Sequence, residues 1–177
     1  MNNKETLYQG KFLKIVKVNE WEFVERTNCT GVVVIIPITK DKKFVFVEQY
    51  RIPIAKNTIE FPAGLVNDDN ESQNETFELA ALRELLEETG YHADKLRYLT
   101  KGPNSAGLTS EISTFFLAED IRKIAEGGGV ENESIIIHEV PMDDVDEWLE
   151  EMKKQGKIYS PKIYAGIYLA KRIYKLI

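Results

Sequence analysis

Three glutamates set close together are the residues of this sequence best suited to chemistry. Glu84, Glu87 and Glu88 lie within five residues, with Arg83 as the cation beside them. On a helix, positions three and four apart share a face, so Glu84 would lie beside both other glutamates. Clustered carboxylate oxygens on a rigid element suit hard divalent cations such as Mg²⁺ or Mn²⁺. Taken alone, however, the three glutamates favour the simpler interpretation of a solvated acidic helix face.

A helix is needed to position these carboxylates, and the surrounding residues predict one. Its apolar side is formed by Phe77, Leu82, Leu85 and Leu86. Ser72 followed by Glu75 predicts a capping box at the start of the helix, and Gly90 suits its C-terminal end. The segment before the helix, residues 67–74, is polar and predicts a loop.

Composition predicts a soluble globular protein in the cytoplasm. The chain of 177 residues can hold one domain of ordinary size plus a small appendage, and it is 43% hydrophobic and 29% charged. A single cysteine, Cys29, cannot form an internal disulfide, which fits a reducing compartment. A net charge of −6 argues against a nucleic-acid partner. The sequence contains neither an apolar leader nor a run long enough for a membrane span, so no membrane partner is expected.

The rest of the chain reads as strands with two further helices. Residues 10–27 alternate apolar and polar side chains with a break at Asn19, which predicts a two-stranded hairpin. A polar break at 27–31 divides the chain into an N-terminal β subdomain, residues 1–30, and a main domain, residues 31–177. Strands are expected at 31–39, 44–51, 57–61, 96–100, 113–118 and 134–140, and helices at 143–154 and from 160 to 177. This mixture predicts an α+β fold, arranged as an α/β/α sandwich.

The order of residues around the glutamates resembles a known family signature. Residues 83–91, RELLEETGY, are similar to the core of the Nudix hydrolase signature, in which G, five residues, E and seven residues precede R-E-U-x-E-E-x-G-U, where U is apolar. Glu75 stands seven intervening residues before Arg83, as the signature requires, whereas Gly64 and Glu75 are separated by ten residues instead of five. The extra residues fall in the polar loop, where an insertion costs little. The resemblance implies the α/β/α sandwich.

The resemblance also implies roles for individual residues. It assigns metal binding to Ala63 (through its carbonyl), Glu84, Glu87, Glu88 and Glu133. It assigns catalytic roles to Glu131, Glu87 and Arg83. Within these sets Glu131 is the expected base, with Glu133 as its rival, and Arg83 is expected to orient carboxylates by pairing with Glu75 or Glu87. Residues 127–129, three glycines, could close over a substrate as a lid, or could belong to an ordinary surface loop.

Stretches outside the signature are similar to the ADP-ribose pyrophosphatase branch of the family: residues 21–27, 48–54, 58–64 and 105–111. They implicate Trp21, Arg26, Arg51, Glu60 and Leu108 in substrate binding. Trp21 could stack on a nucleobase or pack as an ordinary strand residue. Arg26 and Arg51 could bind phosphate or base edges, or form surface ion pairs. The glycine-rich stretch 127–133 is also similar to the branch that cleaves GDP-mannose or UDP-glucose.

The expected function is therefore Mg²⁺-dependent hydrolysis of a nucleoside diphosphate sugar, with Mn²⁺ as a possible substitute. ADP-ribose, giving AMP and ribose 5-phosphate, is the first candidate, and a GDP-mannose or UDP-glucose type substrate is the alternative. A non-catalytic nucleotide-sugar sensor is disfavoured because every signature carboxylate is present. A sanitiser of oxidised nucleoside triphosphates is disfavoured by the N-terminal hairpin. The resemblance implies a homodimer in which the N-terminal parts are exchanged between subunits.

Overall fold

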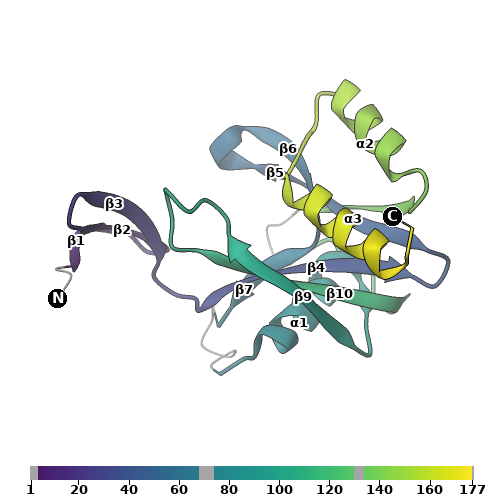
Figure 1. Ribbon diagram of the computed structural model, residues 1–177, viewed down its shortest axis with the longest axis horizontal. Helices are drawn as coiled ribbons and strands as arrows, with labels where there is room; N and C mark the ends of the chain where they lie inside the picture. Colours follow the sequence, from purple (N-terminus) through teal and green to yellow (C-terminus); the bar gives the residue numbers. More distant parts are fainter. Residues whose placement is uncertain (1–3, 68–73, 130–133, 177) are drawn as a thin grey trace.

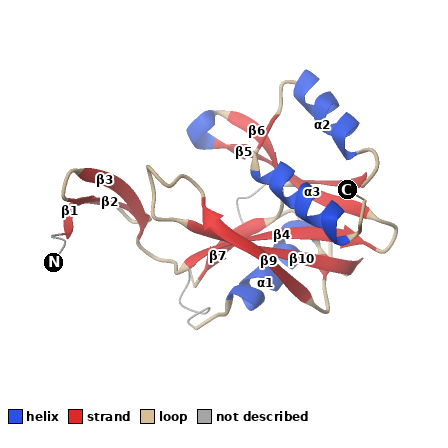
Figure 2. Cartoon of the chain, viewed as in Figure 1, coloured by secondary structure: helices blue, strands red, loops and turns tan. Residues whose placement is uncertain are grey.

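The computed structural model of this protein describes residues 4–67, 74–129 and 134–176. A small N-terminal sheet projects from one side of a larger body, in which a mixed sheet lies between helices on its two faces (Figure 1). Strands and loops dominate the cartoon, with helices confined to the outside (Figure 2). The fold is the predicted α+β sandwich with an N-terminal β subdomain.

The N-terminal sheet contains three strands in the order β1-β2-β3, all antiparallel. Its strands are β1 (Lys4–Gln9), β2 (Leu13–Val18) and β3 (Trp21–Arg26). The predicted hairpin is confirmed as β2 and β3, and Asn19 takes a left-handed φ of 55° in the turn between them. The prediction of only two strands was wrong. All six residues of β1 are exposed, so this strand carries no alternation of buried and polar positions by which it could be recognised.

The larger sheet has the order β12-β6-β5-β4-β10-β8, with β11 beside β5, β7 beside β4 and β9 beside β10. Its strands are β4 (Gly31–Thr39), β5 (Lys43–Arg51), β6 (Lys56–Glu60), β7 (Ala63–Val66), β8 (Tyr91–His92), β9 (Leu96–Pro103), β10 (Ile112–Lys123), β11 (Ile136–Pro141) and β12 (Ile158–Tyr159). The central pair, β4 and β10, is parallel. All six strands expected in this domain are confirmed, while the short strands β7, β8 and β12 were not predicted.

The core of the main domain lies on both faces of this sheet. Along β4, Val33 and Ile35 join one apolar cluster, whereas Val34, Ile36 and Ile38 join the other. This alternation buries both faces of a β-branched strand, as expected for the centre of a sandwich. One cluster is covered by α1 (Phe77–Thr89), and the other by α2 (Val145–Lys154) and α3 (Lys162–Ile173). Helix α3 ends at Ile173, four residues before the predicted end of the last helix at residue 177.

Helix α1 begins later than predicted. Thr76 is its N-cap, and the Thr76 hydroxyl accepts a hydrogen bond of 3.2 Å from the Leu79 amide. The predicted capping box was wrong, because the Glu75 carboxylate instead pairs with Arg83, and Ser72 lies outside the described residues. Gly90 ends the helix in the left-handed region at φ 72°, as predicted, and its amide donates to Leu86.

The loop between β9 and β10 ties the N-terminal sheet to the main domain. The Val24 amide donates to the Leu108 carbonyl at 2.8 Å, and the Ser110 amide donates to the Val24 carbonyl at 3.2 Å. Figure 1 shows this loop reaching from the main sheet toward β3. Among the described helices, none combines the length and apolar character needed to cross a membrane.

Candidate active site

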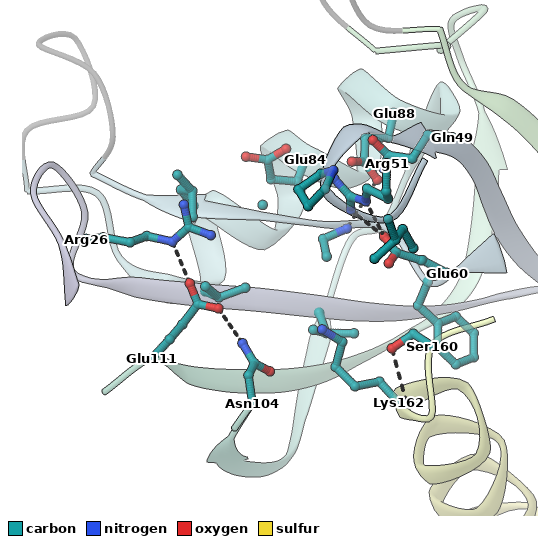
Figure 3. Close-up of a pocket in the computed structure, with 18 residues that line it drawn as sticks. Arg26, Gln49, Arg51, Glu60, Glu84, Glu88, Asn104, Glu111, Ser160 and Lys162 are labelled. Carbon is teal, nitrogen blue, oxygen red and sulfur yellow. Dashed lines mark hydrogen bonds and ion pairs between the residues drawn. The ribbon is translucent and has the colours of Figure 1, made fainter. Parts of the chain in front are cut away.

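A cavity of about 570 Å³ opens between the sheet, helix α1 and the start of α3 (Figure 3). Its lining residues with polar side chains come from five separate parts of the chain: Arg26; Gln49, Arg51 and Glu60; Glu84 and Glu88; Asn104 and Glu111; and Ser160 and Lys162. Carboxylates therefore share one cavity with guanidinium and ammonium groups. This combination suits a ligand that carries both phosphate charge and hydrogen-bonding groups.

Two of the α1 glutamates form the acidic wall of the cavity. Glu88 is only 4% exposed, and its carboxylate accepts a hydrogen bond of 3.1 Å from the Ala63 amide. The carboxyl carbon of Glu84 lies against Gly64, where an added Cβ would be 1.9 Å from it. Only glycine leaves room for this carboxylate. The interpretation of these residues as a solvated acidic face was therefore wrong.

Arg83 holds the carboxylates of the signature in place. Its guanidinium donates to both oxygens of Glu75, at 2.9 and 3.2 Å, and also to Glu84 at 2.8 Å and Glu87 at 3.1 Å. A further bond of 3.0 Å reaches the Leu65 carbonyl. The hydrogen bonds to Glu75 are the main cause of a raised pKa at Arg83, so this side chain stays charged. Arg83 is thus placed to orient carboxylates. These include Glu75 and Glu87, the two partners expected from the sequence.

The longer spacing between Gly64 and Glu75 is accommodated at the base of the loop. The side chain of Asn67 accepts a 2.7 Å hydrogen bond from the Glu75 amide and donates one of 3.0 Å to Thr30. The two ends of the inserted segment therefore meet, and Glu75 still reaches Arg83. The ion pair between Glu75 and Arg83 therefore forms despite the longer spacing.

The glycine-rich segment begins directly on the C-terminal end of α1. The Gly128 amide donates to the Glu88 carbonyl at 2.9 Å, and the Gly129 amide donates to the Glu87 carbonyl at 3.0 Å. Gly127, Gly128 and Gly129 all have positive φ, which glycine adopts at little cost. The described part of this segment is thus anchored to the acidic helix, in contrast to an independent surface loop.

Cationic groups line the remainder of the cavity. Arg51 on β5 forms an ion pair with Glu60 on β6, with the Arg51 Nε at 3.1 Å from the carboxylate. Arg26 on β3 pairs with Glu111 at 2.5 Å, and Glu111 also accepts from Asn104 at 2.5 Å (Figure 3). Both arginines therefore line the cavity with part of their hydrogen-bonding capacity used by ion pairs.

Beside the cavity, β5 also carries a buried carboxylate outside the predicted set. Glu48 accepts hydrogen bonds from Lys157, from Asn57 at 2.7 Å and from the ring of His138 at 3.0 Å. Burial acts to raise the pKa of Glu48, but these hydrogen bonds outweigh it and hold the pKa below its usual value. Glu48 is therefore ionised in the folded protein at neutral pH.

The structure does not bring every predicted residue to this cavity. Trp21 is 66% exposed and borders a separate hollow of about 430 Å³ beside Phe23, residues 106–107 and residues 109–110. Leu108 is exposed and contributes its carbonyl to β3. The Glu87 carboxylate bonds to Arg83 and is absent from the cavity lining. Glu131 and Glu133 lie outside the described residues.

Five lining residues with polar side chains were not predicted as site residues: Gln49, Asn104, Glu111, Ser160 and Lys162. Glu111 ends a stretch already matched to the ADP-ribose branch, and its carboxylate could have been considered as a partner for Arg26. Ser160 and Lys162 follow β12 and begin α3, far from the signature in sequence. No local pattern at these positions predicts a site, because only the tertiary fold brings them to the cavity.

The acidic wall fits a divalent cation. Its donors, the Glu84 and Glu88 carboxylates and the Ala63 carbonyl, are all oxygens, which hard cations prefer. Within the described ranges, no three His, Cys, Asp or Glu residues form a complete metal-binding group. A set of two carboxylates suits Mg²⁺, which keeps waters and shares substrate phosphate oxygens rather than filling a protein cage.

The sandwich fold and the acidic residues of α1 agree with the family that the signature indicated. The sequence matches the family model of the NUDIX domain over residues 29–162. The chain belongs to the Nudix hydrolase family, as its signature predicted, and this family generally uses divalent metal ions.

Relatives in the family carry several activities. The chain is 34% identical to a methanol dehydrogenase activator of Bacillus methanolicus, over 92% of this chain and 87% of the relative. It is 32% identical to an ADP-ribose pyrophosphatase of Bacillus subtilis (strain 168), over 94% and 89%. It is 33% identical to a GDP-mannose pyrophosphatase of Escherichia coli (strain K12), over 80% and 72%. A solved structure of an ADP compounds hydrolase shares the fold, with a TM-score of 0.71 and 22% identity over 98% of this chain and 92% of that chain.

Proposed function

We propose that this protein hydrolyses the diphosphate bond of a nucleoside diphosphate sugar in a reaction that depends on Mg²⁺, with Mn²⁺ as a substitute. The observation that carries the proposal is the single cavity shared by Glu84 and Glu88 with Arg26 and Arg51. ADP-ribose is the first candidate substrate, with AMP and ribose 5-phosphate as products, and the relative in Bacillus subtilis supports it. A GDP-mannose or UDP-glucose type substrate is the alternative, supported by the relative in Escherichia coli.

The side chains divide the chemistry between them. Glu84, Glu88 and the Ala63 carbonyl would be the principal metal ligands, with Glu87 and Glu133 as further ligands. When bound, the ion would neutralise the diphosphate charge, polarise the P–O bonds and lower the pKa of bound water. Arg83 positions Glu84 by the hydrogen bond already described.

Hydrolysis needs a base for the attacking water. We assign this role to Glu131, which would take the proton as the water oxygen attacks phosphorus and the bridging P–O bond breaks. The described neighbours support this assignment, because Gly128 hydrogen-bonds to the carbonyl of Glu88, and the Ile135 amide donates back to Gly128 at 3.3 Å. Both ends of the intervening segment are thus attached beside the acidic wall.

The remaining assignments concern the nucleoside and its surroundings. Arg26, Arg51 and Glu60 would bind the phosphates and the base, and Trp21 and Leu108 would contact the nucleoside. The single cysteine supports a cytoplasmic location.

We further propose a homodimer in which residues 1–30 of one subunit complete the site of the other. Exposed apolar side chains on the N-terminal sheet support this proposal, since Tyr8, Phe12 and Trp21 are 65%, 56% and 66% exposed. Trp21 does not line the cavity of its own subunit. In the proposed dimer, it would instead reach the cavity of the partner subunit. Light scattering of the intact protein and of a variant lacking residues 1–27 tests this arrangement. A monomeric mass for the intact protein at micromolar concentration would refute the shared site.

A substrate panel tests the activity itself. The protein is incubated with Mg²⁺ and ADP-ribose, GDP-mannose, UDP-glucose or a nucleoside triphosphate, and the phosphomonoesters formed are released as phosphate by alkaline phosphatase. Phosphate from a nucleoside diphosphate sugar supports the proposal, and the preferred substrate separates ADP-ribose from the alternatives. Phosphate release cannot report on the nucleoside triphosphate, because alkaline phosphatase attacks the triphosphate directly. For this substrate, the nucleoside monophosphate formed by the protein alone is measured by chromatography. Hydrolysis of the triphosphate alone would contradict the proposal.

A further inference from the structure

A hollow of about 420 Å³ lies between β9 and the C-terminal end of α3, apart from the active-site cavity. Ser160 and Lys162, which line the active-site cavity, stand at the opposite end of α3. A helix rises about 1.5 Å per residue, so the 12 residues of α3 separate the two places by roughly 16 Å. In Figure 1, the chain end marked C follows the end of α3 that borders this hollow. The hollow is therefore a second candidate site.

The side chains that line this hollow carry positive charge. Arg97 on β9, Arg172 on α3 and Lys175 after α3 all line it, and all three are exposed. Of the described residues that line it, none is acidic. Glu119 approaches this end of α3, but its carboxylate accepts a hydrogen bond of 2.7 Å from the Tyr174 hydroxyl. Three cations thus meet in a chain whose net charge is −6.

The ion pairs of the other arginines set this hollow apart. Four of the six arginines in the sequence pair with a carboxylate: Arg26, Arg51, Arg83 and Arg122. For the other two, Arg97 and Arg172, the described part of the chain offers no carboxylate within 4 Å. Arg172 lies 5.7 Å from the centre of the Tyr168 ring, a contact that leaves its N–H donors unused. Both arginines line the same hollow, so their donors are available to a ligand there.

Helix stability explains only part of this arrangement. Cations in the last turn of α3 oppose the partial negative charge of the helix end, which favours Lys171 and Arg172. Lys171 also pairs with Asp146 at 3.3 Å. Arg97, by contrast, adds a further like charge from a strand, and like charges that are brought together repel. An anion bound in the hollow would offset this repulsion.

Apolar side chains complete the lining. Leu99 and Ile173 line the hollow and also pack against the core cluster that α2 and α3 cover. On α3, Leu169, Arg172 and Ile173 are three and four residues apart and therefore share a face. The hollow thus combines an apolar surface with two guanidinium groups and one ammonium group.

We propose that this hollow binds a small phosphate-bearing molecule. Guanidinium groups present their N–H donors in a planar fork that matches two oxygens of one phosphate, and the Lys175 ammonium adds a compact charge. The apolar side chains would contact the organic part of the ligand, and the volume of the hollow lies in the range of small-molecule sites. This second site goes beyond the proposed function and does not depend on it.

The test measures binding of inorganic pyrophosphate to the full-length protein at constant ionic strength, with EDTA present so that no divalent ion holds the probe at the acidic wall. Backbone amide NMR signals locate the binding. We expect saturable shifts at residues 97–99 and 169–175. Arg97→Gln and Arg172→Gln should each raise Kd about 10-fold to 100-fold, the range for loss of a hydrogen bond between charged groups.

Arg122→Gln is the matched control, because Arg122 is an exposed arginine that pairs with Asp94 and does not line the hollow. It should keep the wild-type Kd. No saturable shift at residues 97–99 and 169–175, including the case of shifts confined to the active-site cavity, overturns the inference. An equal Kd in all three glutamine variants also overturns it. Thermal unfolding checks the fold of each variant; if a glutamine variant is unfolded, the lysine variant at the same position replaces it and should still bind more weakly than the wild type, since it lacks the planar fork.

Discussion

Gly64→Ala is the substitution that most sharply tests the placement of the acidic wall. The Cβ of an alanine at position 64 would lie 1.9 Å from the carboxyl carbon of Glu84 and 2.0 and 2.4 Å from its two oxygens. Ordinary contact between such atoms begins at about 3.4 Å, so the carboxylate must move. Its present position is held by Arg83 at 2.8 Å, and a displacement would also disturb that hydrogen bond.

The size of the displacement sets the size of the effect. Moving the Glu84 carboxylate from 1.9 Å to about 3.4 Å requires a shift of about 1.5 Å. A misplacement of about 1 Å in an active site can reduce the rate about 100-fold, so kcat/KM should fall by at least this factor. The free energy of unfolding should fall by about 1–3 kcal/mol, the usual cost of overpacking. Activity should therefore be affected much more severely than the fraction of folded protein.

The assay compares kcat/KM for ADP-ribose with the midpoint of denaturant unfolding. Gly102→Ala is the control, because an added Cβ at Gly102 in β9 would meet no atom within 4 Å. We expect Gly102→Ala to keep wild-type activity. If Gly64→Ala retains wild-type kcat/KM, then the Glu84 carboxylate is not required at this position, and the assignment of the acidic wall as the metal site is refuted.

Three further predictions follow from individual carboxylates. Glu88→Gln keeps an oxygen that can accept from the Ala63 amide, so turnover should fall at least 100-fold while the unfolding midpoint changes little; a near-normal rate would contradict metal binding by Glu88. Glu131→Gln should lower kcat about 10²- to 10⁴-fold with little change in KM, and a mild effect there with a severe one in Glu133→Gln would exchange the two roles. The pKa of Glu48 is lower in the folded than in the unfolded protein, so its stabilising contribution is complete above about pH 4.5 and is lost as the pH falls through the folded value. Glu48→Gln should therefore reduce the loss of stability between about pH 5 and pH 3 in denaturant titrations, and an identical pH dependence would reject this account.

The sequence predicted the elements that follow from local patterns. The stop at Gly90 and the apolar side of α1 depend on neighbouring residues, so both were largely predicted: Phe77, Leu82 and Leu85 join the apolar cluster, whereas Leu86 is not part of it. The start of α1 was predicted too early. Glu75 suits a capping box, but its carboxylate instead forms an ion pair with Arg83 of the same helix. The strand β1 was missed because an exposed edge strand needs no buried alternation.

The composition of the site was predicted less completely than the fold. Arg26, Arg51 and Glu60 were identified through the family resemblance, and each lines the cavity. Lys162 could not be identified, since its approach depends on the packing of α3 at Gly166 rather than on nearby sequence. The position of Trp21 also depends on tertiary contacts, such as the hydrogen bonds between β3 and the loop that carries Leu108, which local sequence does not encode.

We propose that Mg²⁺ held at the acidic wall supports cleavage of a nucleoside diphosphate sugar into two phosphomonoesters. Phosphorus NMR of the protein with ADP-ribose and Mg²⁺ tests this cleavage, because diphosphate and monoester signals are resolved in one sample. We predict that the diphosphate signals are replaced by equal amounts of AMP and ribose 5-phosphate, and that excess chelator stops the conversion. Persistence of the diphosphate signals, or conversion that continues undiminished in chelator, would contradict the account.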